Sequence, residues 1–383
     1  MMPSPALVSR AYEAGRLDEA LTLARDLFAV RPGDADSAYR LGKIHHARGE
    51  IQEALAWARR ALILRPDHAA AHVAVAEALL LSGDYAEGWA EYAWRFRLPG
   101  AAPFLPEHLR LGRPQWQGEP LGDGPLMLVG DQGFGDVIQF SRFIPWVLAQ
   151  GQKTILGVSD EMVPLMRRMF PDLPIATRAQ DYRDFTACCP LSSLPHLHAT
   201  RVETIPPPVP VPVDALRADA WRQRLSQALP AGLRRIGIVW AGRPTHPNDR
   251  NRSIAFAALA DALGGVPGIA LVSLQKGERA GDVRTYAGAA PLLDAAPFLP
   301  DYEDTAAAIA ALDLVVTVDT SVAHLAGTMG HPAWVLLPFV PDWRWLRARE
   351  DTPWYPSLRL VRQQAHGAWD ASLAAVTSAL SEG

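Results

Sequence analysis

The sequence predicts an α-helical repeat array followed by two Rossmann-like α/β domains in a chain of 383 residues. One observation is a 34-residue period in the first hundred residues, which is typical of stacked helical repeats. The other is a pair of series in which short apolar segments alternate with helical patterns, as in parallel α/β sheets. The predicted domains are repeats at 1–100, a first Rossmann-like domain at 101–205, a Pro-rich linker with a connecting helix at 206–233, and a second Rossmann-like domain at 234–383 with a C-terminal helix.

Composition limits the classes of function. With 49% hydrophobic and 20% charged residues, the chain can bury sizeable cores. Its formal net charge of −4 argues against a nucleic-acid partner. The two cysteines, Cys188 and Cys189, are adjacent and offer neither a disulfide framework nor metal-binding spacing. The N-terminal segment lacks a signal-peptide pattern, and no run approaches the ~20 apolar residues of a membrane span, so we expect a soluble cytoplasmic protein.

The repeats are recognised by small residues at fixed intervals. Gly15, Gly49 and Gly83 recur every 34 residues, which is the period of a tetratricopeptide array with two antiparallel helices per unit. The middle unit, residues 34–67, is the clearest match, with Leu41, Gly42, Ala54, Ala61 and Pro66 in pattern. The third unit becomes aromatic, and its rings are expected to cap the array against the next domain or, in the alternative interpretation, to be ordinary core residues: Trp89, Tyr92, Trp94 and Phe96.

The α/β part begins after a Pro- and Gly-rich loop at 101–125. Predicted strands of the first series lie at 126–130, 154–158 and 185–189. Prolines at 206–208, 210 and 212 predict an extended linker. The second series contains "RIGIVWAG", "IALVSLQ", "LDLVVTVDTS", "AWVLLPF" and "LRLVRQ". Ligands of such sheets bind at the carboxyl ends of the strands, where all three motifs below are found.

The first motif is "LMLVGDQGFGDVIQF", residues 126–140. It lacks the third glycine of a dinucleotide fingerprint, and Asp136 at the start of the helix would repel a phosphate. We therefore interpret Gln132, Gly133 and Gly135 as an unusual turn that exposes the carboxylate of Asp136 at a cleft. The alternative is that Asp136 simply caps the helix.

The second motif is the loop "GRPTHPNDRNRSI", residues 242–254, which follows a predicted strand. Arg243, Arg250 and Arg252 present forked donors that match phosphate oxygens. The alternative is ordinary surface charge.

The third motif, "VVTVDTSVAHLAGTMGHP", joins a strand to a helix. Asp319, Thr320 and Ser321 lie at the start of that helix, where free N–H groups and hydroxyls favour a pyrophosphate, and His324 is one turn later. The alternatives are capping by Asp319, Thr320 and Ser321 and a packed His324.

Other candidate sites are weaker. Asp34-x-Asp36 resembles a metal-binding pair of sugar transferases but lies at a repeat turn, where it caps a helix. The histidine pairs at 45–46 and at 196 and 198 lack further ligands at zinc spacing, and no G-x-S-x-G elbow occurs. We predict neither a required metal nor a cofactor.

Together, "GDQGFGDVIQF", "WAGRPTHPNDRNRSI", "VDTSVAHLAGTMGHPAWVLLPFVPDWRW" and "DTPWYPSLRLVRQ" resemble bacterial tetratricopeptide proteins with a glycosyltransferase domain similar to the ADP-heptose:lipopolysaccharide heptosyltransferases. The layout, repeats before a two-Rossmann (GT-B) transferase, is also similar to that of O-GlcNAc transferases. The resemblance implies a catalytic Asp136, a basic residue of the 243–252 loop on the donor phosphates, and a pyrophosphate turn at Asp319, Thr320, Ser321 and His324, with Ser321 in place of the usual glycine. It further implies a nucleoside pocket near Gln275, Glu278 and Asp319.

The resulting hypothesis is a metal-independent inverting glycosyltransferase that uses a nucleotide-diphosphate sugar. The repeats, which lipopolysaccharide heptosyltransferases lack, favour a protein or peptide acceptor such as flagellin. Three alternatives stay open at this point. They are a non-catalytic repeat scaffold with a vestigial transferase fold, a heptosyltransferase-like enzyme acting on a glycan or lipid, and an epimerase or hydrolase of sugar nucleotides.

Overall fold

The computed structural model describes residues 4–99, 112–177 and 184–382. The chain divides into two compact units. The repeat unit contains Met1–Leu105, Pro195–Thr204 and Val340–Ala348, and the α/β unit contains Pro106–Leu194, Ile205–Phe339 and Arg349–Gly383. Of the loop predicted at 101–125, residues 101–111 lie outside the described part.

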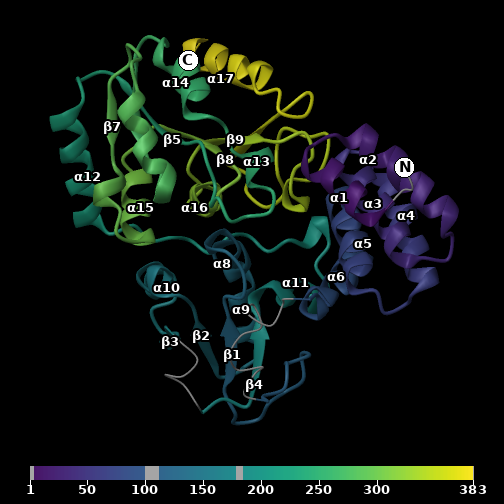
Figure 1. The fold of residues 1–383 in the computed structure, drawn as a ribbon. Helices are drawn as coiled ribbons and strands as arrows, with labels where there is room; N and C mark the ends of the chain where they lie inside the picture. Colours follow the sequence, from purple (N-terminus) through teal and green to yellow (C-terminus); the bar gives the residue numbers. More distant parts are fainter. Residues whose placement is uncertain (1–3, 100–111, 178–183, 383) are drawn as a thin grey trace. The chain divides into compact units, whose positions relative to one another are not determined.

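Paired helices form the repeat unit, as the 34-residue period predicts (Figure 1). They are α1 (Pro5–Glu13), α2 (Leu17–Val30), α3 (Ala35–Ala47), α4 (Ile51–Leu64), α5 (Ala69–Ser82) and α6 (Tyr85–Tyr92). Gly15, Gly49 and Gly83 follow the first helix of each pair with φ of 74°, 76° and 88°. Because this left-handed conformation favours glycine, the recurring glycines set where the first helix of each repeat ends.

The small residues allow the helices to approach closely. A Cβ atom on Gly42 of α3 would lie 3.1 Å from the carbonyl oxygen of Ala54 and 3.2 Å from the amide nitrogen of Ala58 on α4. One on Gly88 of α6 would lie 2.7 Å from a methyl carbon of Leu80 on α5. A larger residue at either position would push apart the two helices of a repeat.

Trp94 and Phe96, which are also predicted to cap the array, are only half-buried. Trp89 and Tyr92 close the end of the array as predicted, and they are 2% and 9% exposed. Their rings lie 5.1 and 6.1 Å from Trp343, and the indole N–H of Trp89 donates to the carbonyl oxygen of Thr200 at 3.1 Å. The predicted domain boundaries do not anticipate that 195–204 and 340–348 belong to this unit. The physical reason is that the last repeat must bury its apolar face against another segment.

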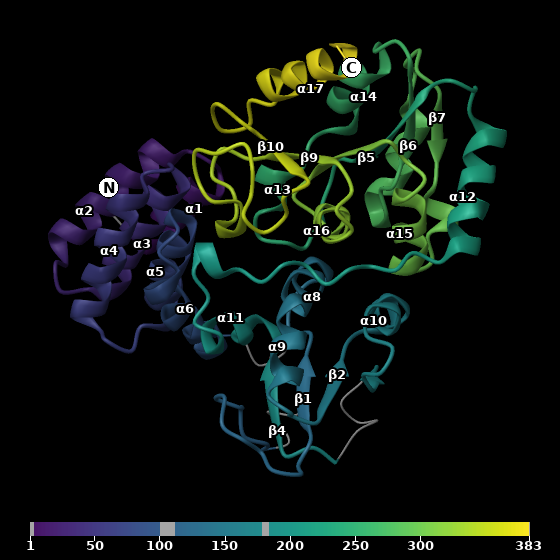
Figure 2. The same ribbon diagram turned by 180° about the vertical axis from the view of Figure 1, so that it is seen from behind.

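The α/β unit contains two parallel sheets, which confirms the predicted fold class (Figures 1 and 2). The first has the order β3-β2-β1-β4, with β1 (Leu126–Val129), β2 (Thr154–Gly157), β3 (Ile175–Ala176) and β4 (Ala187–Pro190). The second has the order β10-β9-β8-β5-β6-β7, with β5 (Arg234–Val239), β6 (Ile269–Ser273), β7 (Leu292–Asp294), β8 (Leu314–Val318), β9 (Ala333–Leu337) and β10 (Leu358–Arg362). Counted within each domain, these orders are 3-2-1-4 and 3-2-1-4-5-6, the Rossmann pattern.

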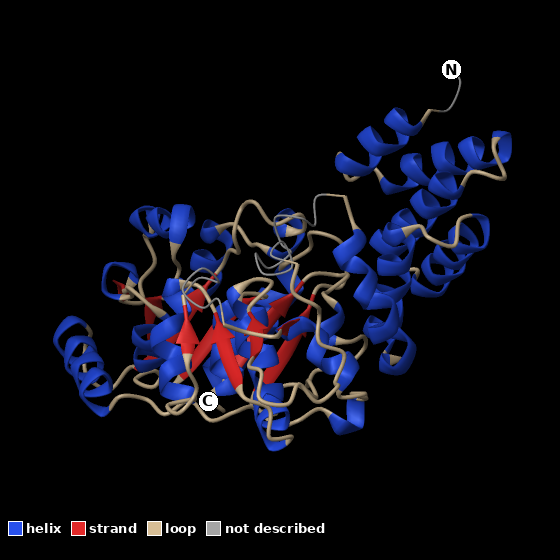
Figure 3. Cartoon of the chain, turned by 90° about the horizontal axis from the view of Figure 1, so that it is seen from below, coloured by secondary structure: helices blue, strands red, loops and turns tan. Residues whose placement is uncertain are grey.

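Helices flank the strands of both sheets (Figure 3). They are α8 (Phe134–Phe140), α9 (Ile144–Ala149), α10 (Val163–Met169), α12 (Ala215–Ala228), α13 (Asp249–Arg252), α14 (Phe256–Gly264), α15 (Tyr302–Ile309), α16 (Ser321–Thr328) and α17 (Asp370–Glu382). The short helix α11 (Leu194–Leu197) lies almost entirely in the 195–204 segment of the repeat unit. In the second domain, α14 and α17 lie together over one face of the sheet, and α15 and α16 lie on the other (Figures 1 and 2). The buried core on the side of α14 and α17 is apolar and includes Ile236, Ile238, Leu271, Val316 and Leu336.

Among the residues that the structure describes, no helix combines the length and the apolar character needed to cross a bilayer.

Candidate functional site

The three motifs singled out in the sequence each follow the carboxyl end of a strand in the α/β unit. In the second domain, β5 and β8 are neighbours, and the chain leaves them toward opposite edges of the sheet. This is a topological switch point, where the loops after adjacent strands open a crevice for ligands. The 242–254 loop follows β5, and the turn before α16 follows β8. In the first domain, the turn after β1 leads into α8.

Asp136 caps the helix on which it lies. Its carboxylate Oδ2 accepts the backbone N–H of Gly133, the residue before α8, at 2.9 Å. The side chain is half-buried rather than turned fully into the core. Just before it, Asp131 ties this turn to the end of β4 by accepting the backbone N–H of Ser192 at 3.2 Å. Gln132, between them, is half-buried.

The prediction of an unusual glycine turn is wrong, because neither Gly133 nor Gly135 has a positive φ. Gly135 instead allows α8 and α16 to pack in contact. A Cβ atom on Gly135 would lie 2.6 Å from Cδ2 of His324, whose ring is 5% exposed and whose Nδ1 pairs with the hydroxyl of Tyr355 at 2.9 Å. His324 is thus a packed histidine, as in the alternative interpretation, and its predicted role at a phosphate stays a prediction.

At the start of α16, the side chain of the N-cap residue Thr320 makes no capping hydrogen bond. Thr320, the residue before the helix, has an extended backbone, and its hydroxyl pairs with that of Thr317 at 3.1 Å. The hydroxyl of Ser321 pairs with that of Tyr302 at 2.7 Å. Asp319, at the end of β8, is 9% exposed. Because the first N–H groups of a helix carry partial positive charge, an uncapped start favours an anion.

Residues from all three motifs meet beside Ser321. The Phe134 cluster consists of Phe134, Arg243, Tyr302 and Ser321. The rings of Phe134 and Tyr302 are 5.2 Å apart, and the guanidinium of Arg243 lies 5.7 Å from the centre of the Phe134 ring. Burial raises the pKa of Tyr302 to about 12, although its bond to Ser321 and the charge of Arg243 oppose that rise. Sequence reasoning missed Tyr302, which belongs to no motif, and passed over Phe134 inside one.

The other two arginines of the loop have different surroundings. Arg252 is largely buried, and its Nε lies 3.8 Å from a carboxylate oxygen of Asp249. A Cβ atom on Gly242 would lie 2.4 Å from Nη2 of Arg252, so the guanidinium packs beneath the loop backbone. Arg250 is exposed on α13. Of the three arginines, only Arg243 belongs to the Phe134 cluster.

Gln275 supports the loop after β5 and does not offer its amide to a nucleoside. It is 3% exposed, and its Oε1 accepts the backbone N–H groups of Trp240 and Ala241 at 3.1 and 3.0 Å. Its Nε2 donates to the carbonyl oxygens of Ala241 and Lys276, each at 3.0 Å. The amide is therefore fully used by the backbone, which corrects the predicted pocket role. Glu278 is exposed after β6, and its role stays a prediction.

Asp34 accepts the backbone N–H groups of Asp36 and Ser37 at the start of α3, which confirms that this acidic pair lies at a helix cap. Within the described ranges, no group of three or more His, Cys, Asp or Glu side chains could hold a metal ion.

Comparison with known proteins supports the repeats directly. The Tetratricopeptide repeat family matches residues 6–69. Protein FlbA of Caulobacter vibrioides is 28% identical over 391 residues, which cover 95% of this chain. The match spans only 63% of the length of FlbA.

Two of the solved structures that this chain resembles are glycosyltransferases. For ADP-heptose LPS heptosyltransferase II of E. coli, identity is 14% and the TM-score is 0.47, covering 67% of this chain and 98% of that one. A family 9 glycosyl transferase of Veillonella parvula is 13% identical with a TM-score of 0.45, and the match covers 65% of this chain and 88% of that one. Because these TM-scores are low, the Rossmann-like assignment rests on strand order. The N-terminal helices of this chain are therefore tetratricopeptide repeats, joined to an α/β unit of two Rossmann-like domains.

Proposed function

We propose that this chain is a metal-independent inverting glycosyltransferase that moves a sugar from a nucleotide-diphosphate donor to an acceptor hydroxyl. The observation that carries the proposal is the start of α16 at the switch point, where Thr320 makes no capping hydrogen bond, with Arg243 and Ser321 in one cluster beside it.

In this proposal, the start of α16 binds the donor diphosphate and stabilises it as the leaving group. As the bond to the sugar breaks, negative charge develops on the leaving diphosphate. Backbone N–H groups at the helix start and the hydroxyl of Ser321, which is bonded to Tyr302, are positioned before the reaction, so they stabilise that charge without reorganising. The exposed Arg243 adds its forked donors. These groups need no metal ion to neutralise the diphosphate.

In this proposal, the start of α8 supplies the general base that acts on the acceptor hydroxyl. Asp136 lies two residues after Phe134, whose ring contacts Tyr302 of the other domain. As general base, its carboxylate would take the proton of the acceptor hydroxyl while that oxygen attacks the sugar from the side opposite the diphosphate, a role typically worth ~10²–10⁴-fold. A single displacement of this kind inverts the configuration at the anomeric carbon of the sugar.

The repeats support a polypeptide as the acceptor. Tetratricopeptide arrays are binding surfaces built from stacked helices, and a transferase for small molecules has no need of one. The resemblance to bacterial repeat-containing glycosyltransferases makes flagellin the acceptor to test first. We further propose that the reaction takes place in the cytoplasm.

The test is calorimetric binding of UDP, ADP, GDP, CDP and CMP in the presence of EDTA. One of these should bind, and Arg243→Ala should weaken its binding by about tenfold or more, because a charged hydrogen bond is lost. Arg250→Ala, in the same loop but outside the Phe134 cluster, is the matched control and should bind nearly as well as wild type. If no nucleotide binds, the chain is a scaffold; if binding requires divalent cations, metal independence is wrong.

A further inference from the structure

The hydroxyls of Tyr302 and Ser321 form a pair at the start of α16, 2.7 Å apart. We propose that Tyr302 is a positioning residue, whose hydroxyl donates to Oγ of Ser321 and so directs the proton of Ser321 toward an anion at the helix start. This inference rests on the proposed function and names a residue through which that site is ordered.

The direction of the hydrogen bond follows from the chemistry of the two groups. A phenol is a stronger donor than an alkyl hydroxyl, and burial raises the pKa of Tyr302 to about 12, so the phenol keeps its proton. When Oγ of Ser321 accepts this proton, its own O–H must point elsewhere. A hydroxyl that accepts one bond also becomes a better donor for the next, because chains of hydrogen bonds polarise one another.

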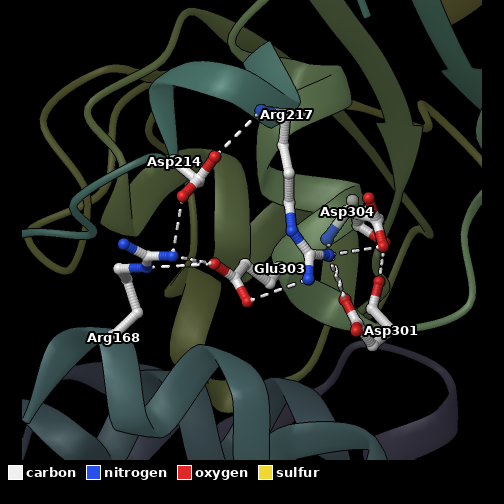
Figure 4. A network of polar contacts seen from close by, with 7 residues as sticks. Arg168, Asp214, Arg217, Asp301, Glu303 and Asp304 are labelled. Atoms are coloured by element: carbon white, nitrogen blue, oxygen red, sulfur yellow. Dashed lines mark hydrogen bonds and ion pairs between the residues drawn. The ribbon is translucent and has the colours of Figure 1, made fainter. Parts of the chain in front are cut away.

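An ion-pair network holds the helix that begins at Tyr302 (Figure 4). Asp301 caps α15 by accepting the backbone N–H of Asp304 at 2.8 Å. Arg217 of α12 reaches carboxylate oxygens on both sides of Tyr302, at 3.7 Å for Asp301, 3.5 Å for Glu303 and 2.6 Å for Asp304. These carboxylates hold the first turn of α15 in place, and with it the backbone of Tyr302.

The network also joins the two Rossmann-like domains. Arg168 of α10, in the first domain, donates through Nε to a carboxylate oxygen of Glu303 at 3.0 Å and through Nη2 to Asp214 at 3.0 Å (Figure 4). Glu303 is 8% exposed, whereas the side chain of Arg168 is 37% exposed, so only one partner of this contact is buried. Isolated exposed ion pairs contribute little, whereas a shared network with a buried member can hold one geometry.

The ring of Tyr302 is held by the first domain as well, because Phe134 packs edge-on against it. Tyr302 is thus fixed by α12 and α10 through its backbone and by α8 through its ring. We infer that the Tyr302–Ser321 pair takes its productive geometry when the two domains are in contact.

A purely structural role for Tyr302 makes a different prediction, and a double-mutant cycle separates the two. Tyr302→Phe removes one oxygen and keeps the ring. It should weaken binding of inorganic pyrophosphate, and of the nucleoside diphosphate that wild type binds, by about 3- to 10-fold in calorimetry. The KM for the donor sugar should rise by a similar factor with little change in the thermal midpoint.

The decisive comparison is with Ser321→Ala. If Tyr302 acts through Ser321, the double variant should bind no more weakly than Ser321→Ala alone. Tyr286→Phe is the matched control, because its hydroxyl donates to the carbonyl oxygen of Ala290 at 2.7 Å in the same domain, outside the Phe134 cluster. It should leave pyrophosphate binding unchanged.

Two results would overturn the inference alone, provided that wild type binds a diphosphate. One is unchanged binding by Tyr302→Phe, and the other is fully additive losses in the double variant. If wild type binds neither pyrophosphate nor any nucleoside diphosphate, the proposed function fails and this inference fails with it.

Discussion

Two helices, α8 and α16, begin where strands of parallel sheets end, one in each Rossmann-like domain, and pack against each other. Their first turns differ. At α8 the carboxylate of Asp136 accepts a backbone N–H, whereas at α16 the hydroxyls of Thr320 and Ser321 bond to Thr317 and Tyr302, and Thr320 makes no capping hydrogen bond.

This difference shows that equivalent helix starts in two similar domains can favour different ligands, because one can repel an anion and the other can attract it. A carboxylate at a helix start satisfies the positive end of the helix from within and repels an incoming anion. An uncapped start beside an arginine attracts one. In our proposal the donor diphosphate therefore binds at α16, and the acceptor proton is removed at α8.

The largest expected effect comes from Asp136→Asn, which keeps the cap but removes the base. The amide oxygen of asparagine can still accept the N–H of Gly133, so the free energy of unfolding should change by less than about 1 kcal/mol. The rate of sugar transfer should fall ~10²–10⁴-fold. Steady-state kinetics and thermal unfolding measure the two effects. Transfer at the wild-type rate would show that Asp136 is a cap and nothing more.

The next variant, Ser321→Asp, gives α16 the acid that α8 has. A carboxylate about 4 Å from a phosphate costs about 1–4 kcal/mol at surface dielectric values, so diphosphate binding should weaken on the order of 100-fold. The same carboxylate should raise the thermal midpoint slightly, because it complements the helix dipole. Ser321→Asn is the control, since it can cap without charge. If Ser321→Asp binds diphosphates like wild type, the anion site is elsewhere.

Gly135→Ala tests the contact that brings the two helices together. The added methyl would meet the ring of His324 at 2.6 Å, and a buried ring has little room to move. We expect a loss of about 1–3 kcal/mol in the free energy of unfolding, measured by urea denaturation. Gly281→Ala, where no atom lies within 4 Å of the added carbon, should be nearly neutral. Equal stability of both variants would mean that α8 and α16 are not in close contact.

The smallest effect is an alkaline loss of stability near α16. The pKa of Tyr302 is about 12 in the folded protein against 10.0 for an ordinary tyrosine. The protonated phenol of Tyr302 therefore makes its full contribution to the free energy of unfolding below pH 10, and this contribution is lost as the pH rises from 10 to 12. After screening by solvent we expect roughly 1–2 kcal/mol. Tyr302→Phe should reduce the pH dependence of urea unfolding over this range, and an unchanged slope would place Tyr302 in solvent.

Patterned elements could be predicted from the sequence because each depends on local geometry. The 34-residue period is set by glycines that adopt left-handed backbone conformations, and the strands β5, β6, β8 and β9 are mostly apolar because helices cover both faces of their sheet. The two-residue β3 and three-residue β7 left no recognisable pattern, since a strand that short shows neither a periodicity nor a long apolar run.

Site residues were harder, because residue type does not tell what a side chain faces. Gln275 and His324 are polar residues near strand ends, yet one amide is used by four backbone groups and one ring is packed against Gly135. Arg243 could not be separated from Arg252 by sequence, although Asp249 pairs with only the second. Tyr302 belongs to no motif and is found only through its bond to Ser321.

By itself the amino-acid sequence determined the repeats, the two Rossmann-like domains and the three turns that carry Asp136, Arg243 and Ser321, because periodicity and turn chemistry act within a few residues. Only the tertiary structure decided which of those groups meet. Packing of α8 against α16, and of Phe134 against Tyr302, joins residues more than 160 positions apart in the chain. Such contacts depend on complementary shapes that no local pattern records.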